Sequence, residues 1–294
     1  MAERVVFVNG SFVHERDACI SVFDHGLLYG DGAFDTAVAW KGQVFRLEQH
    51  LDRLFKSLAY LRIEPPYDRD ALRTLILETI RRNDLDTAYV KCVITRGVTP
   101  TPLMDVENAR PGCVIFAQPY LSMVDDERRR HGLKLKTSAL RRPGGDSLDS
   151  RVKSLNYLSL VLAKIEAVGS GADNAILASA KGEICEGAGF NIFAVHETTL
   201  LTPVDDALGG ITRGAVIDVA LRTELCVRET SLTLYDLYTA DEVFVTSTAG
   251  GVIAVASVDS RPIGKGSPGP IFEMISRGYQ ELLETPGEGT PIGV

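Results

Sequence analysis

Residues 183–193 read EICEGAGFNIF, a pattern typical of two apolar strands joined by a glycine-rich turn. Glu186 stands where the first strand meets the turn. Its carboxylate either lies in solvent or points inward. An inward carboxylate needs a cationic partner, because an unpaired buried charge is costly. The protonated nitrogen of a pyridine ring is one such partner. The segment therefore indicates strands in this half of the chain and a candidate anionic site at the turn.

Two further turns, C-terminal to this segment, combine glycine with threonine. Residues 209–213 read GGITR at the expected start of a helix, and residues 246–251 read TSTAGG after an apolar strand. Each pattern alone is also an ordinary turn. Free backbone N–H groups converge at a helix N-terminus, and glycine lets the backbone approach an anion closely. Both turns are therefore candidate sites for a phosphate or a carboxylate.

A candidate nucleophile lies on the N-terminal side of the opening segment. Lys153 belongs to residues 151–157, which read RVKSLNY and precede an apolar helix that we expect over Ser154–Val168. Taken alone, it is a solvated lysine at a helix start, although the helix dipole slightly disfavours a cation there. The alternative is an amine that forms a Schiff base with a carbonyl cofactor.

Arg53 lies on a strongly amphipathic segment. Leucine and phenylalanine recur every three or four residues over 47–61, which predicts a helix with one apolar face. We expect Pro65-Pro66 to end this helix. Arg53 flanks this apolar stripe. It is either a surface arginine paired with Asp52 or Glu48, or an inward guanidinium that clamps a phosphate with its planar set of donors.

The remaining pattern predicts an α/β or α+β fold. A strand pair is expected around Asn9-Gly10, and a second helix over Arg69–Arg82 with Asp68 as its N-cap. The other expected elements are strands at 33–40, 88–95, 112–118, 174–179, 183–185, 190–195, 243–246 and 252–258, and helices at 212–223 and 270–283.

A change to charged and polar sequence after Tyr120 marks a domain junction. We therefore expect a small N-terminal domain at 1–120, a linker at 121–132 and a larger C-terminal domain at 133–294. The tail from Thr285 is expected to fray.

Composition excludes several classes of protein. The chain has 294 residues, of which 45% are hydrophobic and 24% charged, the usual mix of a globular protein. Its net charge of −8 opposes nucleic-acid binding, which needs a basic surface. No run approaches the roughly 18 apolar residues of a membrane span, and the start, MAERVVFVNG, does not resemble a secretory signal. We therefore expect a cytoplasmic protein with no nucleic-acid or membrane partner.

Metal and nucleotide motifs are missing from the sequence. The five cysteines are scattered without a C-x-x-C pair, and the five histidines form no H-x-x-x-H pair, so we expect neither disulfides nor a bound metal. The Rossmann fingerprint, the Walker A loop and the G-x-S-x-G motif are also absent. An anionic cofactor would have to be held by a few buried cations and backbone turns.

The candidate segments occur in a recognisable order. Residues 23–34 read FDHGLLYGDGAF and residues 50–54 read HLDRL; the Lys153 segment, Glu186-Gly187, residues 210–213 (GITR) and Thr248-Ala249 follow. This ordered set resembles the class IV aminotransferases, the fold type IV enzymes that use pyridoxal 5'-phosphate (PLP). The resemblance extends from about Val5 to Tyr279. The family includes branched-chain aminotransferases, D-amino acid aminotransferases, (R)-selective amine transaminases and aminodeoxychorismate lyases.

The resemblance implies a two-domain fold with PLP between the domains, and a role for each candidate residue. Lys153 would be the Schiff-base lysine and proton carrier, and Glu186 would pair with the pyridine nitrogen. The phosphate would be held by Arg53, the backbone of Ile211 and Thr212, and Thr248. Tyr157 would lie near the phenolic oxygen of the cofactor. The substrate would meet Tyr29, Phe34, Lys91 and Ala249. The resemblance also implies a homodimer or a larger homo-oligomer.

The choice of family member depends on a few positions. Stretches such as residues 94–97 (ITRG) and 186–192 (EGAGFNI) are similar to (R)-amine transaminases, so our first expectation is transfer from an (R)-amine or small hydrophobic donor to a 2-oxo acid such as pyruvate. Tyr29 and the charge of Lys91 suit the alternative, a branched-chain L-amino acid aminotransferase with 2-oxoglutarate as acceptor. Thr101 and Leu103 replace the Arg and His of D-amino acid enzymes. The lyase, and a protein that has lost catalysis, are further alternatives.

Overall fold

The computed structural model describes residues 3–293 except 102, 121 and 267. The chain clusters into two compact units. Unit 1 comprises Met1–Leu121, Val152–Asn156 and Leu283–Val294, and unit 2 comprises Ser122–Arg151 and Tyr157–Leu282. Two short segments of the region expected as the C-terminal domain, 133–294, therefore cluster with unit 1. Residue 121 of the expected linker lies outside the described residues.

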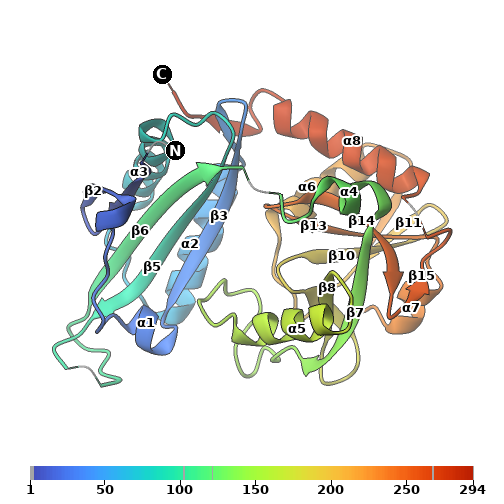
Figure 1. The fold of residues 1–294 in the computed structure, drawn as a ribbon, viewed down its shortest axis with the longest axis horizontal. Helices are drawn as coiled ribbons and strands as arrows, with labels where there is room; N and C mark the ends of the chain where they lie inside the picture. The colour runs from blue at the N-terminus through green and yellow to red at the C-terminus, as the bar shows by residue number, and fades with distance from the viewer. Residues whose placement is uncertain (1–2, 102, 121, 267, 294) are drawn as a thin grey trace. The chain divides into compact units, whose positions relative to one another are not determined.

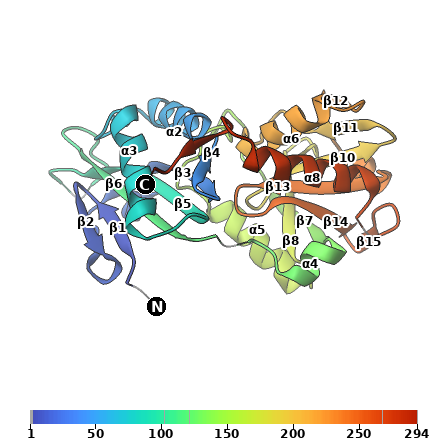
Figure 2. The same ribbon diagram turned by 90° about the horizontal axis from the view of Figure 1, so that it is seen from above.

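Unit 1 is built on an antiparallel sheet (Figure 1). Its described strands pair in the order β16-β4-β3-β5-β6-β1-β2. Their bounds are β1 Val5–Val8, β2 Ser11–His14, β3 Gly32–Trp40, β4 Gln43–Phe45, β5 Ala88–Val98, β6 Arg110–Pro119 and β16 Gly289–Pro291. The helices are α1 His25–Tyr29, α2 Leu47–Leu61 and α3 Arg69–Arg82, with a short 3-10 turn, Glu15–Asp17. Figure 2 shows α2 and α3 on the same face of this sheet.

The core of unit 1 lies between α2, α3 and the sheet. Alternate residues of β3, such as Ala33 and Ala37, point to this side, and the leucines of α2 pack against them. Both helices were predicted, α3 with the bounds that the structure has, because apolar periodicity is a strong signal where one helix face is buried. The Asp68 side chain accepts a hydrogen bond from the Ala71 N–H (2.8 Å) and caps α3 as predicted.

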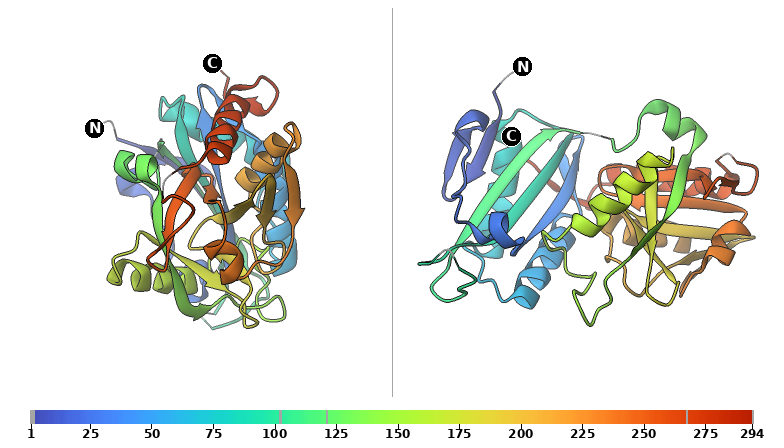
Figure 3. Two further views of the ribbon diagram at one scale, coloured as in Figure 1. Left: turned by 90° about the vertical axis from the view of Figure 1, so that its right-hand side faces the viewer. Right: turned by 60° about the horizontal axis from the view of Figure 1, so that its bottom comes forward.

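Unit 2 is built on a mixed sheet, with described strands in the order β12-β11-β10-β13-β14-β7-β8-β9 and β15 beside β14. The strands are β7 Leu133–Arg141, β8 Asn174–Ala178, β9 Ile184–Gly187, β10 Asn191–His196, β11 Thr199–Thr202, β12 Cys226–Glu229, β13 Glu242–Ser247, β14 Gly251–Val258 and β15 Arg261–Pro262. The helices are α4 Asp126–His131, α5 Leu158–Gly169, α6 Ile211–Leu221, α7 Leu234–Tyr238 and α8 Pro270–Glu284. Figure 3 shows α5, in yellow-green, beside the strands β7 and β8 that it contacts.

Three local expectations were wrong. Helix α5 begins at Leu158 and not at Ser154, so Lys153 lies in an extended segment outside the helix. Helix α2 ends at Leu61, where Arg62 takes a left-handed conformation (φ 53°), before the Pro65-Pro66 pair that was expected to stop it. The described part of the tail after Thr285 is not frayed, because β16 pairs with β4. In the described part of the chain, no helix is long and apolar enough to cross a membrane.

Candidate active site

Lys153 is held in unit 1 by backbone hydrogen bonds. The carbonyl of Lys153 accepts a hydrogen bond from the N–H of Phe34 on β3 (3.0 Å). The next residue, Ser154, forms an antiparallel bridge with Ala33. On the other side, the Lys153 N–H donates to Oγ of Ser57 on α2 (3.0 Å). The segment that carries the candidate amine is therefore fastened to both a strand and a helix.

The side chain of Lys153 lies over an aromatic ring that a second lysine shares. Nζ of Lys153 is 4.6 Å from the ring centroid of Phe34, and Nζ of Lys91 is 4.7 Å from the same centroid. Lys91 lies on β5 opposite Thr36, whose side chain is on the same face of the sheet as Phe34. The structure thus brings together three of the predicted residues. Tyr29 lies on α1, and its exposed ring meets His25 edge to face at 5.0 Å.

Arg53 points inward and is paired with Asp35 of β3. Its Nε donates to Oδ2 of Asp35 (2.8 Å), and its Nη2 donates to Oδ1 (2.8 Å). The side chain of Arg53 is 11% exposed. The surface alternative, pairing with Asp52 or Glu48, is wrong, because both of these acids bind Arg69 of α3 instead.

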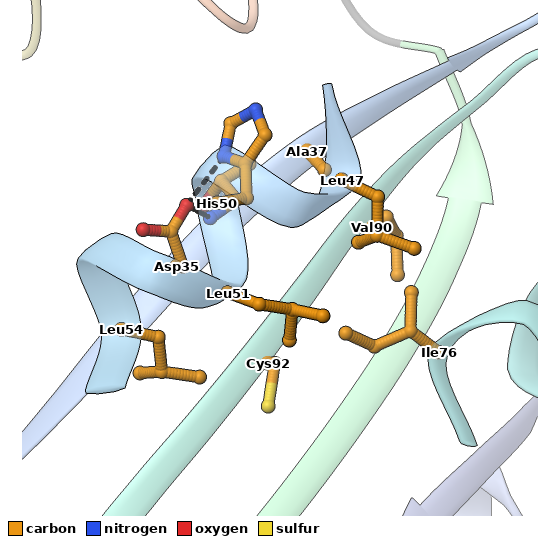
Figure 4. A pocket seen from close by; sticks show the side chains of 10 residues that line it. Asp35, Ala37, Leu47, His50, Leu51, Leu54, Ile76, Val90 and Cys92 are labelled. Atoms are coloured by element: carbon orange, nitrogen blue, oxygen red, sulfur yellow. Dashed lines mark hydrogen bonds and ion pairs between the residues drawn. The ribbon is translucent and has the colours of Figure 1, made fainter. Parts of the chain in front are cut away.

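A third group, His50, completes this buried cluster. Its Nδ1 lies 2.7 Å from Oδ1 of Asp35, and Figure 4 shows the two side chains directed at each other. Burial would raise the pKa of Asp35, but the charges and hydrogen bonds of Arg53 and His50 outweigh it and hold that pKa well below the usual range. Burial lowers the pKa of His50, against the attraction of Asp35. At neutral pH the cluster therefore holds one cation, one anion and a neutral imidazole.

A small cavity lies beside this cluster (Figure 4). Its volume is about 10 Å³, and apolar side chains such as Leu51, Ile76 and Val90 line most of it. A space of this size is close to the minimum for one water molecule. It is far too small for a cofactor, so the cavity is a packing feature of the helix–sheet core.

Glu186 in unit 2 is a buried carboxylate with defined partners. Its Oε1 lies 2.8 Å from Nε of Arg142, and its Oε2 accepts a hydrogen bond from the N–H of Leu208 (3.0 Å). Both charged side chains are nearly buried, at 6% exposure for Glu186 and 12% for Arg142. Nε of Arg142 makes no well-directed hydrogen bond within the described residues, so the contact is an ion pair. Of the two alternatives for Glu186, the structure shows the inward one.

The loop that binds Glu186 leads directly into α6. Asn191 of β10 donates from Nδ2 to the carbonyl of Leu208 (2.7 Å). A Cβ atom on Gly210 would lie 2.0 Å from Oδ1 of Asn191, so a larger residue here would displace the Asn191 side chain. Helix α6 then begins at Ile211, followed by the buried Thr212, and no side chain in the described residues caps it. Glu186 and this helix start are thus joined through one loop.

Three further predicted positions of unit 2 lie in a turn or at the start of a helix. Thr248 and Ala249 form the turn between β13 and β14, and the Ala249 carbonyl accepts a hydrogen bond from the N–H of Met123 (2.8 Å). Just before this turn, Oγ1 of Thr246 is buried without a hydrogen-bond partner in the described residues. Tyr157 is the N-cap residue of α5 and packs on the small core beneath that helix.

These features match a known family. Residues 32–258 match the sequence model of the family Amino-transferase class IV, and the chain belongs to that family of PLP-dependent enzymes. One relative is a protein of Methanocaldococcus jannaschii whose name assigns it provisionally to the branched-chain-amino-acid aminotransferases. It is 41% identical over 279 residues, which span 94% of this chain and 96% of the relative. The branched-chain-amino-acid aminotransferase of Pseudomonas aeruginosa is 33% identical over 291 residues, spanning 96% and 94% of the two chains.

The fold is also that of solved aminotransferases. The structure of a branched-chain amino acid aminotransferase from the organism abbreviated T.th., with pyridoxamine 5'-phosphate, matches with a TM-score of 0.92 and 32% identity, over 100% of both chains. This match confirms the predicted fold class and the predicted family.

The residues present fit the cofactor of this family. Arg53 supplies a nearly buried guanidinium, and α6 begins without a side-chain cap, both of which suit a phosphate group. The unsatisfied hydroxyl of Thr246 lies on β13 opposite Asn191, which holds the loop before α6. Within the described residues, no group of three or more His, Cys, Asp or Glu side chains is arranged to hold a metal ion.

Four supporting residues were not singled out from the sequence: Asp35, Ser57, Arg142 and Asn191. Asp35 gave the clearest available signal, because it occupies a core-facing position between the alanines of β3, where an acid requires a partner. Arg142 and Asn191 gave none, since an arginine beside a glycine-rich loop or an asparagine in a strand is common.

Proposed function

We propose that the protein is a branched-chain L-amino acid aminotransferase with 2-oxoglutarate as the acceptor. The support is similarity over nearly the whole chain to relatives that carry this name. The sequence alone favoured an (R)-amine transaminase and held the branched-chain enzyme as the alternative. The relatives favour the alternative.

One observation favours an amino acid over a simple amine as the amino donor. A second ammonium, that of Lys91, lies on the Phe34 ring that also contacts the Lys153 ammonium. An amino acid or a 2-oxo acid brings a carboxylate, and a cation near the reacting amine stabilises it. An (R)-amine donor brings no carboxylate, so in that reaction only the 2-oxo acid acceptor would use such a group, whereas in a branched-chain enzyme both the donor and the acceptor would use it. Phe34 and Tyr29 then supply apolar contact for a branched side chain, and Ala249 of unit 2 is a further proposed substrate contact.

The remaining residues take roles toward the cofactor. PLP, when bound, supplies an electron sink for the negative charge that develops at the substrate's α-carbon. Lys153 supplies the amine and moves the proton at that carbon. Glu186, held by Arg142, would keep the ring nitrogen protonated. The phosphate would be bound by Arg53, the backbone N–H groups of Ile211 and Thr212, and Thr248, and Tyr157 would contact the phenolic oxygen.

We propose that the enzyme works as a homo-oligomer, at least a dimer. Helix α5 exposes an apolar face, which includes Leu158, Val161, Ile165 and Val168. Exposed apolar patches of this kind mark protein interfaces. Light scattering coupled to size exclusion measures the mass, and Ile165→Glu is expected to shift it toward the monomer.

A panel of substrates tests the proposed reaction. Leucine with 2-oxoglutarate is compared with (R)-1-phenylethylamine plus pyruvate, D-alanine plus 2-oxoglutarate, and aminodeoxychorismate without an acceptor. We expect turnover of leucine to exceed that of the other donors. Turnover of the (R)-amine without leucine would sink the proposal, and release of pyruvate from aminodeoxychorismate with no amino transfer would identify a lyase.

A further inference from the structure

We propose that Asp35 is a positioning residue that sets the Arg53 guanidinium for the cofactor's phosphate, with His50 as its second anchor. This inference rests on the proposed function in one respect, that Arg53 binds a phosphate ester. It does not depend on which amino acid is the substrate.

The first support is the two-point contact between the two side chains. Nε and Nη2 of Arg53 each donate to a different oxygen of Asp35, both at 2.8 Å. A single hydrogen bond would let the guanidinium rotate, whereas two parallel bonds fix both its plane and its direction. Asp35 lies on β3 and Arg53 on α2, so the pair joins two elements of regular structure.

The second support is that the Asp35 carboxylate is itself fixed. Oδ1 accepts hydrogen bonds from the backbone N–H of Thr36 (2.7 Å) and from Nδ1 of His50 (2.7 Å), in addition to that from Arg53. An ionised carboxylate only accepts, so His50 carries its proton on Nδ1. With these donors around it, Asp35 has one orientation, and it transmits that orientation to the guanidinium.

The third support links Arg53 to the candidate amine. Oγ of Ser57 donates to the Arg53 carbonyl (2.9 Å) and accepts from the Lys153 N–H (3.0 Å). One hydroxyl therefore ties the backbone of the phosphate-binding residue to that of the lysine. The covalent frame of PLP keeps its phosphate and its aldehyde carbon at a set separation. The protein must then keep Arg53 and Lys153 at a matching separation. A guanidinium that is fixed in one orientation keeps this separation constant.

A purely structural role for the pair is the competing explanation. Buried ion pairs often add little net stability compared with apolar replacements, so the fold alone does not require one here. A structural role would change the stability of the apoprotein without changing its affinity for phosphate compounds. A positioning role would change the affinity of a protein that remains folded.

The test measures binding to the apoprotein by titration calorimetry, with PLP and with inorganic phosphate as separate probes. Asp35→Ala and the isosteric Asp35→Asn are the variants, and Asp35→Glu tests rescue. Asp52→Asn is the matched control, because Asp52 is on the same helix as Arg53 but binds Arg69. Circular dichroism confirms that each variant is folded.

We expect Asp35→Ala and Asp35→Asn to weaken PLP binding by about 10- to 100-fold, and Asp52→Asn to leave it unchanged. Because Asp35 acts through Arg53, the double variant Asp35→Ala/Arg53→Ala is expected to bind no more weakly than Arg53→Ala alone. Wild-type affinity in a folded Asp35→Asn variant, or fully additive losses in the double variant, would overturn the inference. Failure of the unaltered apoprotein to bind PLP would instead overturn the proposed function.

Discussion

Nε of Arg142 lies 2.8 Å from Oε1 of Glu186, and both side chains are nearly buried. Two charges in such a place stabilise each other, but removal of one leaves the other in a poor environment. The other carboxylate oxygen is bound by a backbone N–H, which compensates for only part of the charge. Arg142 is therefore a cation that helps to keep Glu186 in place before a cofactor binds.

The first prediction concerns this pair. Arg142→Met is expected to destabilise the apoprotein by about 3–5 kcal/mol, because it removes the Arg142 cation from a nearly buried carboxylate. Bound PLP should recover part of the loss, since its ring nitrogen offers a replacement cation. Urea denaturation with and without PLP measures both effects. Arg16→Met, at an exposed pair with Glu3, is the control and should change stability by less than about 1 kcal/mol. Equal stability of Arg142→Met and the unaltered protein would contradict the prediction.

The second prediction concerns Lys153. Lys153→Ala should lower turnover by about 10²–10⁴-fold, because it removes the group that moves the proton. Borohydride treatment followed by mass spectrometry should place the cofactor on the peptide that contains residue 153 in the unaltered protein and nowhere in the variant. The exposed Lys56 of α2 provides the control, since Lys56→Ala should keep both the label and the activity. A label that persists elsewhere in Lys153→Ala would show that another lysine has this role.

The third prediction concerns Lys91. Replacement by Met removes the second cation near the Phe34 ring and should raise the KM for 2-oxoglutarate about tenfold, the effect of one charged hydrogen bond. Lys91→Arg should retain most of the affinity. Lys41→Met, at an exposed pair with Glu284, controls for the change in net charge. An unchanged KM for every carboxylate substrate would remove Lys91 from the substrate site.

The site also shows where sequence reasoning succeeds. Helices α2 and α3 were predicted, α3 with its observed bounds, because a buried face repeats at helical spacing. The ordered motifs identified the family because each glycine turn occurs at the right place in the chain. Both kinds of information are local in the sequence.

The partners of the charged residues were harder to predict. Asp52 is adjacent to Arg53 in sequence, but neighbours on a helix point in different directions, and Asp52 binds Arg69 instead. The true partner, Asp35, lies on strand β3, and the way in which α2 packs on β3 decides that Arg53 meets it. Likewise β16 is a three-residue edge strand that contains Gly and Pro, so nothing in its composition distinguishes it from a loop.

The last prediction concerns the pH dependence of stability. The unfolded chain protonates His50 near pH 6.5, whereas burial lowers its pKa in the folded protein, where Asp35, Arg53 and Lys153 are the charges that act on it. The unfolded state therefore binds more protons below pH 6.5, and the free energy of unfolding falls as the pH drops from 7.5 to 5. His50 contributes a slope of at most about 1.4 kcal/mol per pH unit. His50→Asn should remove that contribution, with the exposed His131→Asn as the control. Parallel curves for His50→Asn and the unaltered protein in urea denaturation would show that His50 is not the group responsible.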